Sequence, residues 1–231
     1  MADLPHNELI RAFVSLGVTI VIMLAVLFGP AGTLDWPLGW WFMAAFLLLT
    51  LIAIAWLWRI NPEIFAARSR LTREGSKGWD ILLVLVLFAC LLGVLVVAGL
   101  DSGRFHWAPA PGWAIALGYL LLIVGYAGSI WATAVNRHFE PTVRIQSDRG
   151  HQVITTGPYA YIRHPGYSFA NILTVGMALS LGSLWALVPA VLTIALLAVR
   201  TTLEDATLQR ELPGYAEFTK STRFKWIPGV W

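Results

Sequence analysis

Four long stretches without a formal charge restrict the fold of this chain more than any other feature of its sequence. They are residues 12–28, 38–58, 81–100 and 113–135. The hydrocarbon core of a lipid bilayer is about 30 Å thick, so a helix needs about 20 predominantly apolar residues to cross it. We therefore predict that each stretch forms a membrane-spanning helix.

A fifth charge-free stretch, residues 169–199, is too long for a single ordinary crossing. As one helix it would extend roughly 46 Å, at about 1.5 Å per residue. Ser180, Gly182 and Ser183 offer a turn near its middle. Together the five stretches predict an all-α integral membrane protein of about six helices, in which four full spans are followed by a helical hairpin.

The composition agrees with a membrane protein and argues against other classes. Hydrophobic residues make up 58% of the 231 residues and charged residues 13%, whereas soluble domains are nearer half apolar and a quarter charged. The net charge of +3 is too small to suggest a surface for nucleic acid. One cysteine, Cys90, and five scattered histidines favour neither a disulfide framework nor a metal site. The predicted partner is the lipid bilayer, with no nucleic acid and no metal.

The distribution of basic residues predicts the orientation, because lysine and arginine are retained on the cytosolic side. Only Arg104 lies on the opposite side. The others are Arg11; Arg59, Arg68, Arg70, Arg73 and Lys77; Arg137, Arg144, Arg149 and Arg163; and Arg200, Arg210, Lys220, Arg223 and Lys225. We expect a multi-pass protein of the inner or plasma membrane, with both termini and the loop at residues 136–168 in the cytosol.

That loop is much longer than a connection between two helices needs to be, which is typical of functional loops. It contains three of the five histidines, four arginines and the turn sequence Thr156-Gly157-Pro158-Tyr159. Glycine lets a backbone approach a ligand closely, while tyrosine and histidine combine hydrogen-bonding groups with flat apolar faces. The composition fits a nucleotide-like pocket, and it fits equally a rigid amphipathic loop whose arginines contact lipid phosphates.

A second polar feature follows the last apolar stretch. Arg200 and Glu204 are four residues apart, so they lie on one face of a helix. They could form an ordinary surface ion pair, which contributes at most about 1 kcal/mol. Alternatively, Arg200 could bind a polar or anionic group at the membrane boundary while Glu204 accepts hydrogen bonds from a ligand. The spacing alone does not distinguish the two interpretations.

The C-terminal part of the chain carries an ordered set of motifs. They are His151, Gly157-Pro158-Tyr159, Arg163-His164-Pro165-x-Tyr167, Arg200-x-x-x-Glu204-Asp205, Tyr215 and Trp226-Ile227-Pro228. In this order they closely resemble the isoprenylcysteine carboxyl methyltransferase and phospholipid methyltransferase superfamily of integral-membrane enzymes. The chain departs from the usual pattern in two places. Asp205 replaces a glutamate, and a Phe-Gly-x-x-Tyr stretch is shortened to Leu212-Pro213-Gly214-Tyr215.

The resemblance implies a cofactor, S-adenosylmethionine, held between the loop and the C-terminal segment without a Rossmann fold. We accordingly expect N-terminal transmembrane helices at residues 1–112 and a catalytic membrane core at residues 113–231. This core contains the cofactor-binding loop 136–168 and the C-terminal segment 200–231. The implied cofactor-binding residues are His151, Gln152, Val153, Gly157, Tyr159, Arg163, His164, Pro165, Tyr167 and Glu204, and the implied catalytic residues are Arg200 and Glu204.

Individual roles also follow from the resemblance. His164 and Tyr167 would close on the amino-acid and ribose parts of the cofactor, and Glu204 would take its polar atoms. Arg200 would orient the methyl acceptor at the mouth of a lipid-facing cavity. Arg163 would either bind the cofactor carboxylate or brace the loop.

The leading hypothesis is a membrane methyltransferase that acts on a lipophilic or membrane-presented acceptor, with a carboxylate, amine or thiol as the nucleophile. A membrane reductase with a similar core would place NADPH in the same pocket. A small transporter or assembly protein is the non-enzymatic alternative. It fits less well, because the predicted spans contain no mid-membrane charge, which substrate pathways usually need.

Overall fold

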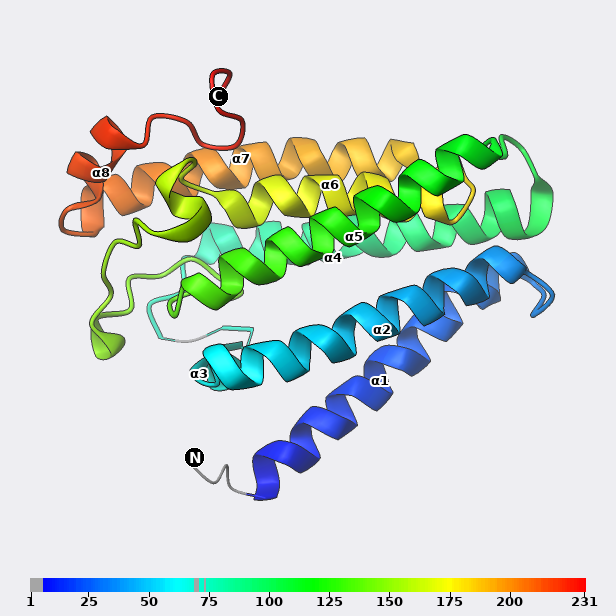
Figure 1. Ribbon diagram of the computed structural model, residues 1–231, viewed down its shortest axis with the longest axis horizontal. Coiled ribbons are helices and arrows are strands. Elements are labelled where there is room, and N and C mark those ends of the chain that lie inside the picture. The colour runs from blue at the N-terminus through cyan, green and yellow to red at the C-terminus, as the bar shows by residue number, and fades with distance from the viewer. Residues whose placement is uncertain (1–5, 69–70, 73) are drawn as a thin grey trace.

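The computed structural model describes residues 6–68, 71–72 and 74–231, which form a bundle of α-helices without a strand in that part of the chain (Figure 1). The helices are α1 (His6–Ala31), α2 (Pro37–Ile60), α3 (Glu63–Arg68), α4 (Gly78–Ala98), α5 (Gly112–Val135), α6 (Pro165–Ser180), α7 (Leu187–Glu211) and α8 (Tyr215–Ser221). A π-helical segment, Gly99–Phe105, extends α4. Short 3-10 helices at Ser147–Arg149 and Gly157–Ala160 interrupt the long loop.

The predicted all-α membrane architecture is confirmed. Among the residues whose side chains the structure describes, four segments are long and apolar enough to cross a bilayer: α2, α4 with its π-helical extension, α5 and α7. The first predicted span, residues 12–28, lies within α1, and the described apolar part of this helix is Gly17–Ala31. The predicted hairpin corresponds to α6 and α7, which are joined by residues 181–186, and Gly182 in the turn has a positive φ of 76°.

Two boundaries differ from the sequence-based expectation. α6 begins at Pro165 instead of residue 169, because proline is well tolerated in the first turn of a helix, where its missing N–H would have no partner. α7 continues to Glu211, so the predicted C-terminal segment 200–231 starts inside a helix. As a result, Tyr167 and Glu204 both project from helices, which hold side chains more firmly than loops do.

Helices α5 and α6 pack closely because glycines lie at their interface. A Cβ atom on Gly125 would lie 2.4 Å from the backbone nitrogen of Leu173, and one on Gly176 would lie 2.4 Å from that of Leu122. Small residues allow membrane helices to approach until their backbones are in contact. This tight pair holds both ends of the long loop, which leaves α5 and returns at the start of α6.

Asp101 organises the end of the bundle opposite the long loop. Its fully buried carboxylate accepts hydrogen bonds from the backbone N–H of Ala108 at 2.8 Å and from the hydroxyl of Ser183 at 2.6 Å. The backbone N–H of Ala110 also donates to the carbonyl of Gly182 at 2.9 Å. These bonds join the α4–α5 connection to the hairpin turn, so the far end of the bundle is closed.

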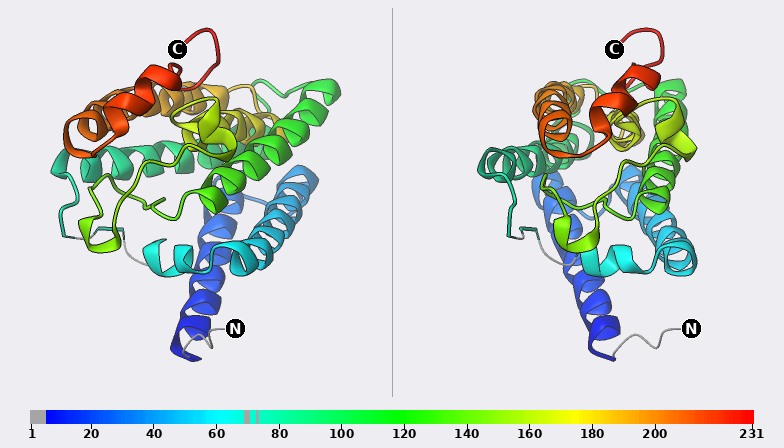
Figure 2. Two further views of the ribbon diagram at one scale, coloured as in Figure 1. Left: turned by 60° about the vertical axis from the view of Figure 1, so that its left-hand side comes forward. Right: turned by 90° about the vertical axis from the view of Figure 1, so that its left-hand side faces the viewer.

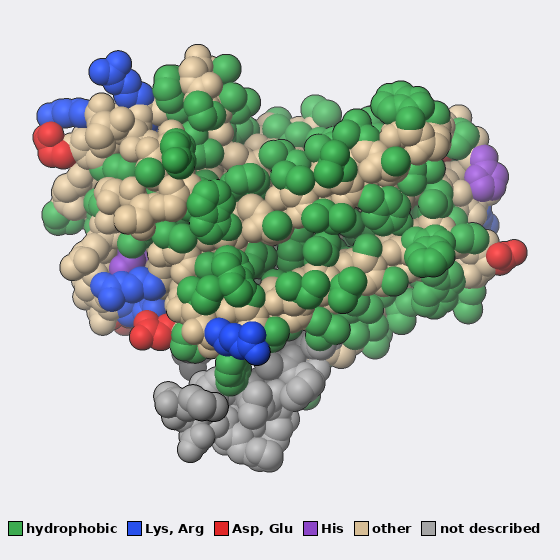
Figure 3. All heavy atoms as spheres, viewed as in Figure 1, with side chains coloured by type: hydrophobic (Ala, Val, Ile, Leu, Met, Phe, Trp, Pro, Cys, Tyr) green, Lys and Arg blue, Asp and Glu red, His purple; other side chains and the backbone are tan. Residues whose placement is uncertain are grey.

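The surface matches a bilayer setting. Hydrophobic side chains cover the middle of the bundle, and most charged side chains in this view lie toward its ends (Figure 3). α3, the connection at residues 136–164 and α8 lie at one end, and the connections from α1 to α2 and from α4 to α5 lie at the other (Figure 1). The side chain of Arg104, in the α4–α5 connection, lies near Gly32 at the end of α1. Arg70, Arg73 and the side chain of Arg11, which contributed to the predicted orientation, are outside the described residues.

Candidate functional site

A cavity of about 190 Å³ lies at the end of the bundle that carries the long loop. It is enclosed by this loop, the first turn of α6, the C-terminal part of α7 and residues of α8, with Arg68 of α3 at one side. Figure 2 (right) views the bundle from this end. The cavity brings together the two polar segments that the sequence analysis identified separately.

Nine of the predicted site residues line the cavity. They are His151, Gln152, Val153, Tyr159, Arg163, His164, Tyr167, Arg200 and Glu204. Two others, Gly157 and Pro165, are not among the lining residues. Gly157 starts a 3-10 helix with a positive φ of 59°, and Pro165 is the first residue of α6. These two residues therefore shape the chain around the cavity without facing into it.

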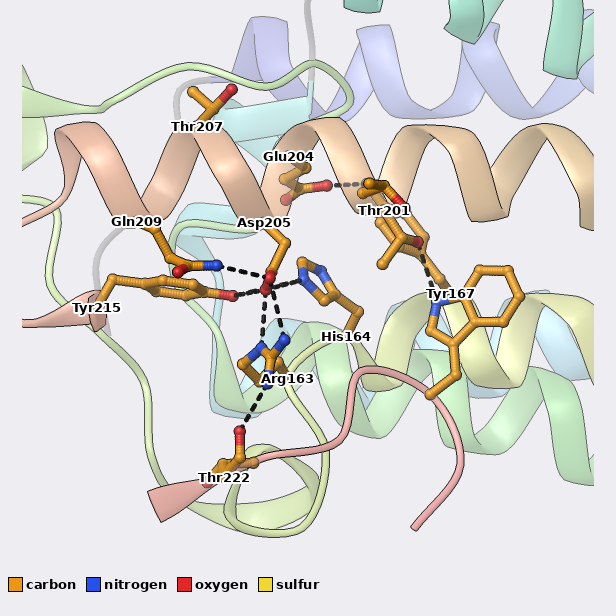
Figure 4. A network of polar contacts seen from close by, with 12 residues as sticks. Arg163, His164, Tyr167, Thr201, Glu204, Asp205, Thr207, Gln209, Tyr215 and Thr222 are labelled. Carbon is orange, nitrogen blue, oxygen red and sulfur yellow. Dashed lines mark hydrogen bonds and ion pairs between the residues drawn. The ribbon is translucent and has the colours of Figure 1, made fainter. Parts of the chain in front are cut away.

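Asp205 connects the loop to α7 and α8 (Figure 4). One carboxylate oxygen accepts hydrogen bonds from Nε of Arg163 at 2.8 Å and from the hydroxyl of Tyr215 at 3.0 Å. Nε2 of His164 lies 3.1 Å from the same oxygen, and Nε2 of Gln209 donates to the other oxygen at 2.9 Å. Asp205 is thus surrounded by protein donors, and these contacts join the loop, α7 and α8 beside the cavity.

Arg163 is committed to the same network. Its Nη2 donates to Asp205 at 3.0 Å, and its Nη1 donates to the carbonyls of Thr222 at 2.9 Å and Arg223 at 2.6 Å. All three nitrogens of the guanidinium therefore have acceptors within the protein. Of the two roles that the sequence left open for Arg163, this geometry favours bracing the loop against the C-terminal segment.

The two departures from the superfamily pattern meet in this network. Gly214, with a positive φ of 83°, makes the tight turn from α7 into α8. This turn brings the hydroxyl of Tyr215 to Asp205. Burial, and then the nearby carboxylates of Asp205 and Glu204, raise the pKa of Tyr215. Its phenol therefore stays protonated and donates the hydrogen bond.

Glu204 has a different environment from its neighbour Asp205. Its partly exposed carboxylate lines the cavity and accepts a hydrogen bond from the hydroxyl of Tyr167. Tyr167 is the partner found for this carboxylate in the described part of the chain. Because an ionised carboxylate offers about four lone-pair positions, Glu204 can accept further hydrogen bonds from a ligand.

The ring of Tyr167 is in contact with two other side chains. It stacks on His164, with ring centroids 5.8 Å apart, and the guanidinium carbon of Arg200 lies 5.3 Å from its centre. A cation over an aromatic face is attracted by the negative charge of the ring. The hydroxyl of Tyr167 therefore approaches Glu204 from a fixed position.

Arg200 pairs with Asp80, a residue that the sequence analysis missed. Its Nε and Nη2 donate to the two carboxylate oxygens of Asp80 at 2.7 and 2.9 Å. Nη2 also donates to the carbonyl of Pro141 at 2.8 Å, and Asp80 accepts from the backbone N–H of Val143 at 2.6 Å. The pair therefore fixes one wall of the cavity. The sequence shows only that Asp80 directly precedes the apolar stretch 81–100. Carboxylates are common at such positions, so this placement does not indicate that Asp80 pairs with Arg200.

Two histidines in the loop are kept neutral by their hydrogen bonds. The backbone N–H of Gln146 donates to Nδ1 of His151 at 3.3 Å, and that of Gln152 donates to Nε2 of His138 at 3.4 Å. A protonated imidazole has no acceptor nitrogen, so each ring must be neutral. Burial, followed by His138 and Arg144, lowers the pKa of His151 to about 4. His138, which also lines the cavity, was not identified from the sequence.

We expect the protein to lose stability as the pH falls from about 6.5 toward 4, because of His151. The unfolded imidazole binds a proton near pH 6.5, whereas the folded one binds it only near pH 4. The unfolded state therefore takes up the proton first. The thermal unfolding midpoint, followed by tryptophan fluorescence, should fall by about 2 to 4 °C for each kcal/mol lost.

The variant His151→Asn should flatten this pH dependence, because an asparagine oxygen can accept the Gln146 hydrogen bond without titrating. His106→Asn removes an exposed imidazole at the opposite end of the bundle and controls for the loss of a histidine as such. An identical pH dependence in the wild type and His151→Asn would contradict the assignment.

The comparison with known families adds a biochemical class to this geometry. Residues 113–213 match the family model described as phospholipid methyltransferase. No curated protein matches the chain. Within the described residues, no group of three His, Cys, Asp or Glu side chains could hold a metal ion. The matched segment contains α5, α6, the long loop and α7, and therefore most of the cavity wall. Residues 113–213 are therefore similar to the membrane methyltransferases of the superfamily that includes the phospholipid and isoprenylcysteine carboxyl methyltransferases.

Proposed function

We propose that the protein transfers a methyl group from S-adenosylmethionine to a lipophilic or membrane-presented acceptor. Glu204 carries this proposal. It is a carboxylate in the cavity of the matched segment, and it retains capacity to accept hydrogen bonds from a ligand. The neighbouring carboxylates Asp205 and Asp80 are each paired with an arginine and are less suited to that task.

The donor groups of the cavity fit this cofactor. S-adenosylmethionine combines a cationic sulfonium and an ammonium group with ribose hydroxyls and a flat adenine ring. Glu204 would hold cationic or hydroxyl groups, and the aromatic rings of Tyr159, Tyr167 and Phe218 would contact its apolar faces. The neutral His151 and the adjoining Gln152 and Val153 would complete the wall. When bound, the sulfonium supplies an already activated methyl group.

The protein's own task is then mainly to align the acceptor and exclude water. Arg200 would contribute by fixing Tyr167 and residues 141–143, and its predicted contact with the acceptor remains part of the proposal. A carboxylate acceptor needs no base. An amine or thiol acceptor would have to lose a proton, which Glu204 or a neutral histidine could accept.

The proposed setting is the cytosolic face of the inner or plasma membrane. The cavity lies at the end of the bundle where the loops that contain most of the basic residues are found. Because lysine and arginine are retained on the cytosolic side of a membrane, this location supports a cytosolic cavity. The N-terminal helices would anchor the protein, and residues 113–231 would form the catalytic core. The acceptor would then reach the cavity from the cytosolic leaflet.

The decisive experiment is calorimetric titration of the detergent-purified protein with S-adenosylhomocysteine and, in parallel, with NADPH. We expect saturable binding of S-adenosylhomocysteine alone. Binding of NADPH alone would contradict the proposal and support a reductase. If folded protein bound neither ligand, a non-enzymatic role in transport or assembly would become the better explanation.

A further inference from the structure

Arg68 enters the cavity from outside the matched segment. It is the last residue of α3, and its side chain lines the cavity. Two contacts hold this part of the chain in place: Ile64 of α3 packs against Leu57 of α2, and Nδ2 of Asn61, which lies between α2 and α3, donates to the carbonyl of Thr133 in α5 at 3.3 Å. The position of Arg68 is therefore set by packing and by a buried hydrogen bond.

The guanidinium of Arg68 is available to a ligand. Its carbon lies 5.3 Å from the centre of the Phe139 ring, which supports the side chain by a cation–π contact. Across the described ranges, no carboxylate or carbonyl forms an ion pair or hydrogen bond with it. The side chain of Arg68 is exposed. Desolvation by the surrounding protein lowers the pKa of its guanidinium; Tyr126 raises this pKa and the charge of Arg200 lowers it, and the net change is a decrease. The guanidinium still remains charged, because arginine is not deprotonated in proteins.

The other three arginines that line the cavity each have a carboxylate partner. The pairs are Arg200 with Asp80, Arg163 with Asp205 and Arg144 with Glu140. Arg68 therefore contributes a positive charge that the described residues leave without a paired carboxylate. A guanidinium of this kind binds the two oxygens of a phosphate or carboxylate with parallel hydrogen bonds.

The location of Arg68 favours the methyl acceptor over the cofactor as its ligand. Apart from Phe218 in α8, the residues proposed for the cofactor lie in the matched segment, whereas α3 precedes it. α3 also directly follows the membrane-spanning α2, whose last turns expose Trp56, Trp58 and Ile60 to 40%, 37% and 53%. Exposed tryptophans near the end of a spanning helix mark the headgroup level of a bilayer. The polar group of a membrane-presented molecule would therefore reach Arg68.

We propose that Arg68 forms an oxyanion subsite that binds a phosphate or carboxylate group on the methyl acceptor. The inference rests on the proposed methyltransferase function and narrows its substrate to acceptors that carry an anionic group. Arg68 would be a specificity-determining residue, since an acceptor without that group would leave its charge unpaired in the cavity.

The test compares soluble probes that separate the anionic group from the lipid chains. Full-length protein saturated with S-adenosylhomocysteine would be titrated with dioctanoyl phosphatidylglycerol, dioctanoylglycerol, decanoate and inorganic phosphate. The variants are Arg68→Gln, Arg68→Lys and the matched control Arg59→Gln, which removes an exposed arginine at the end of α2 that does not line the cavity. Calorimetry or tryptophan fluorescence would report the binding.

We expect phosphatidylglycerol to bind more tightly than dioctanoylglycerol. Arg68→Gln should weaken phosphatidylglycerol by about 10-fold to 100-fold, as for loss of a hydrogen bond to a charged group. Arg68→Lys should retain part of the affinity, and Arg59→Gln all of it. Decanoate or inorganic phosphate binding that depends on Arg68 would support recognition of the oxyanion itself, and binding of phosphatidylglycerol alone would support a lipid headgroup.

Two results would overturn the subsite. One is an unchanged phosphatidylglycerol affinity in Arg68→Gln. The other is a loss of S-adenosylhomocysteine affinity in that variant without a loss of lipid affinity, which would place Arg68 in the cofactor site. If wild-type protein bound no S-adenosylhomocysteine but bound anionic lipid through Arg68, the proposed function would fail while the anion site remained, so the two failures are distinguishable.

Discussion

Removing either partner of the Arg200–Asp80 pair should lower the free energy of unfolding by about 3 to 5 kcal/mol, the effect of leaving one charge buried without its partner. Asp80 is fully buried, and Arg200 is 8% exposed. Arg200→Met leaves the carboxylate unpaired, and Asp80→Asn leaves the guanidinium unpaired while keeping an acceptor for the Val143 N–H. SDS titration in mixed micelles, followed by tryptophan fluorescence, would measure both effects.

The double variant Asp80→Asn/Arg200→Met should be more stable than the sum of its single effects predicts, because no uncompensated charge remains. A coupling energy of about 1 to 3 kcal/mol is expected for two groups in direct contact. The chain provides a matched control in Lys77 and Glu211, which join the start of α4 to the end of α7 at 2.7 Å but are 29% and 40% exposed. Lys77→Met and Glu211→Gln should each change stability by at most about 1 kcal/mol.

If the Arg200–Asp80 variants and the Lys77–Glu211 variants changed the free energy of unfolding by equally small amounts, the burial of Arg200 and Asp80 would be contradicted. Such a result would indicate that water reaches both charges. The stability measurement must also precede any interpretation of turnover in Arg200 variants, since the same guanidinium holds the carbonyl of Pro141 and lies over the ring of Tyr167. Lost activity in an Arg200 variant therefore does not by itself show a contact with the acceptor.

The helices could be predicted closely because one physical constraint, the thickness of the bilayer, fixes their apolar length. α5 begins one residue before the predicted stretch 113–135 and ends with it. The start of α6 was less predictable, since Pro165 and Gly166 are typical of loops unless proline occupies the first helical turn. The π-helical extension of α4 was also missed. Its Asp101 accepts a hydrogen bond from Ser183, 82 residues later, and a single sequence does not reveal such a tertiary contact.

The candidate site could be predicted only where its residues form a motif within one part of the chain. The residues from His151 to Tyr167 and from Arg200 to Glu204 lie in such motifs, and the structure places most of them around one cavity. Asp80 and Arg68 belong to no motif. Asp80 meets Arg200 across 120 residues, and Arg68 reaches the cavity through the packing of α3, so both depend on tertiary contacts that a single sequence does not reveal.

Glu204→Gln should weaken S-adenosylhomocysteine binding by about 10-fold to 100-fold, as expected when a ligand loses a hydrogen bond to a charged group. Glutamine keeps the shape of the side chain and an oxygen that can accept from the hydroxyl of Tyr167. The unfolding midpoint should therefore stay near that of the wild type, and the loss should reflect the missing negative charge. Calorimetry with each variant would measure the affinity. Glu211→Gln makes the same chemical change on the same helix outside the cavity, so it should leave the affinity unchanged.

The pattern of loss would also locate Glu204 within the reaction. If turnover falls while S-adenosylhomocysteine affinity is retained, Glu204 acts on the acceptor, as a base for an amine or thiol. If both fall together, the carboxylate binds the cofactor, as we propose. If neither changes, Glu204 has no part in the site, although its carboxylate faces the cavity with a single partner found among the described residues. A wall built from Asp205 and Asp80 could not replace it, because arginines already pair with both carboxylates.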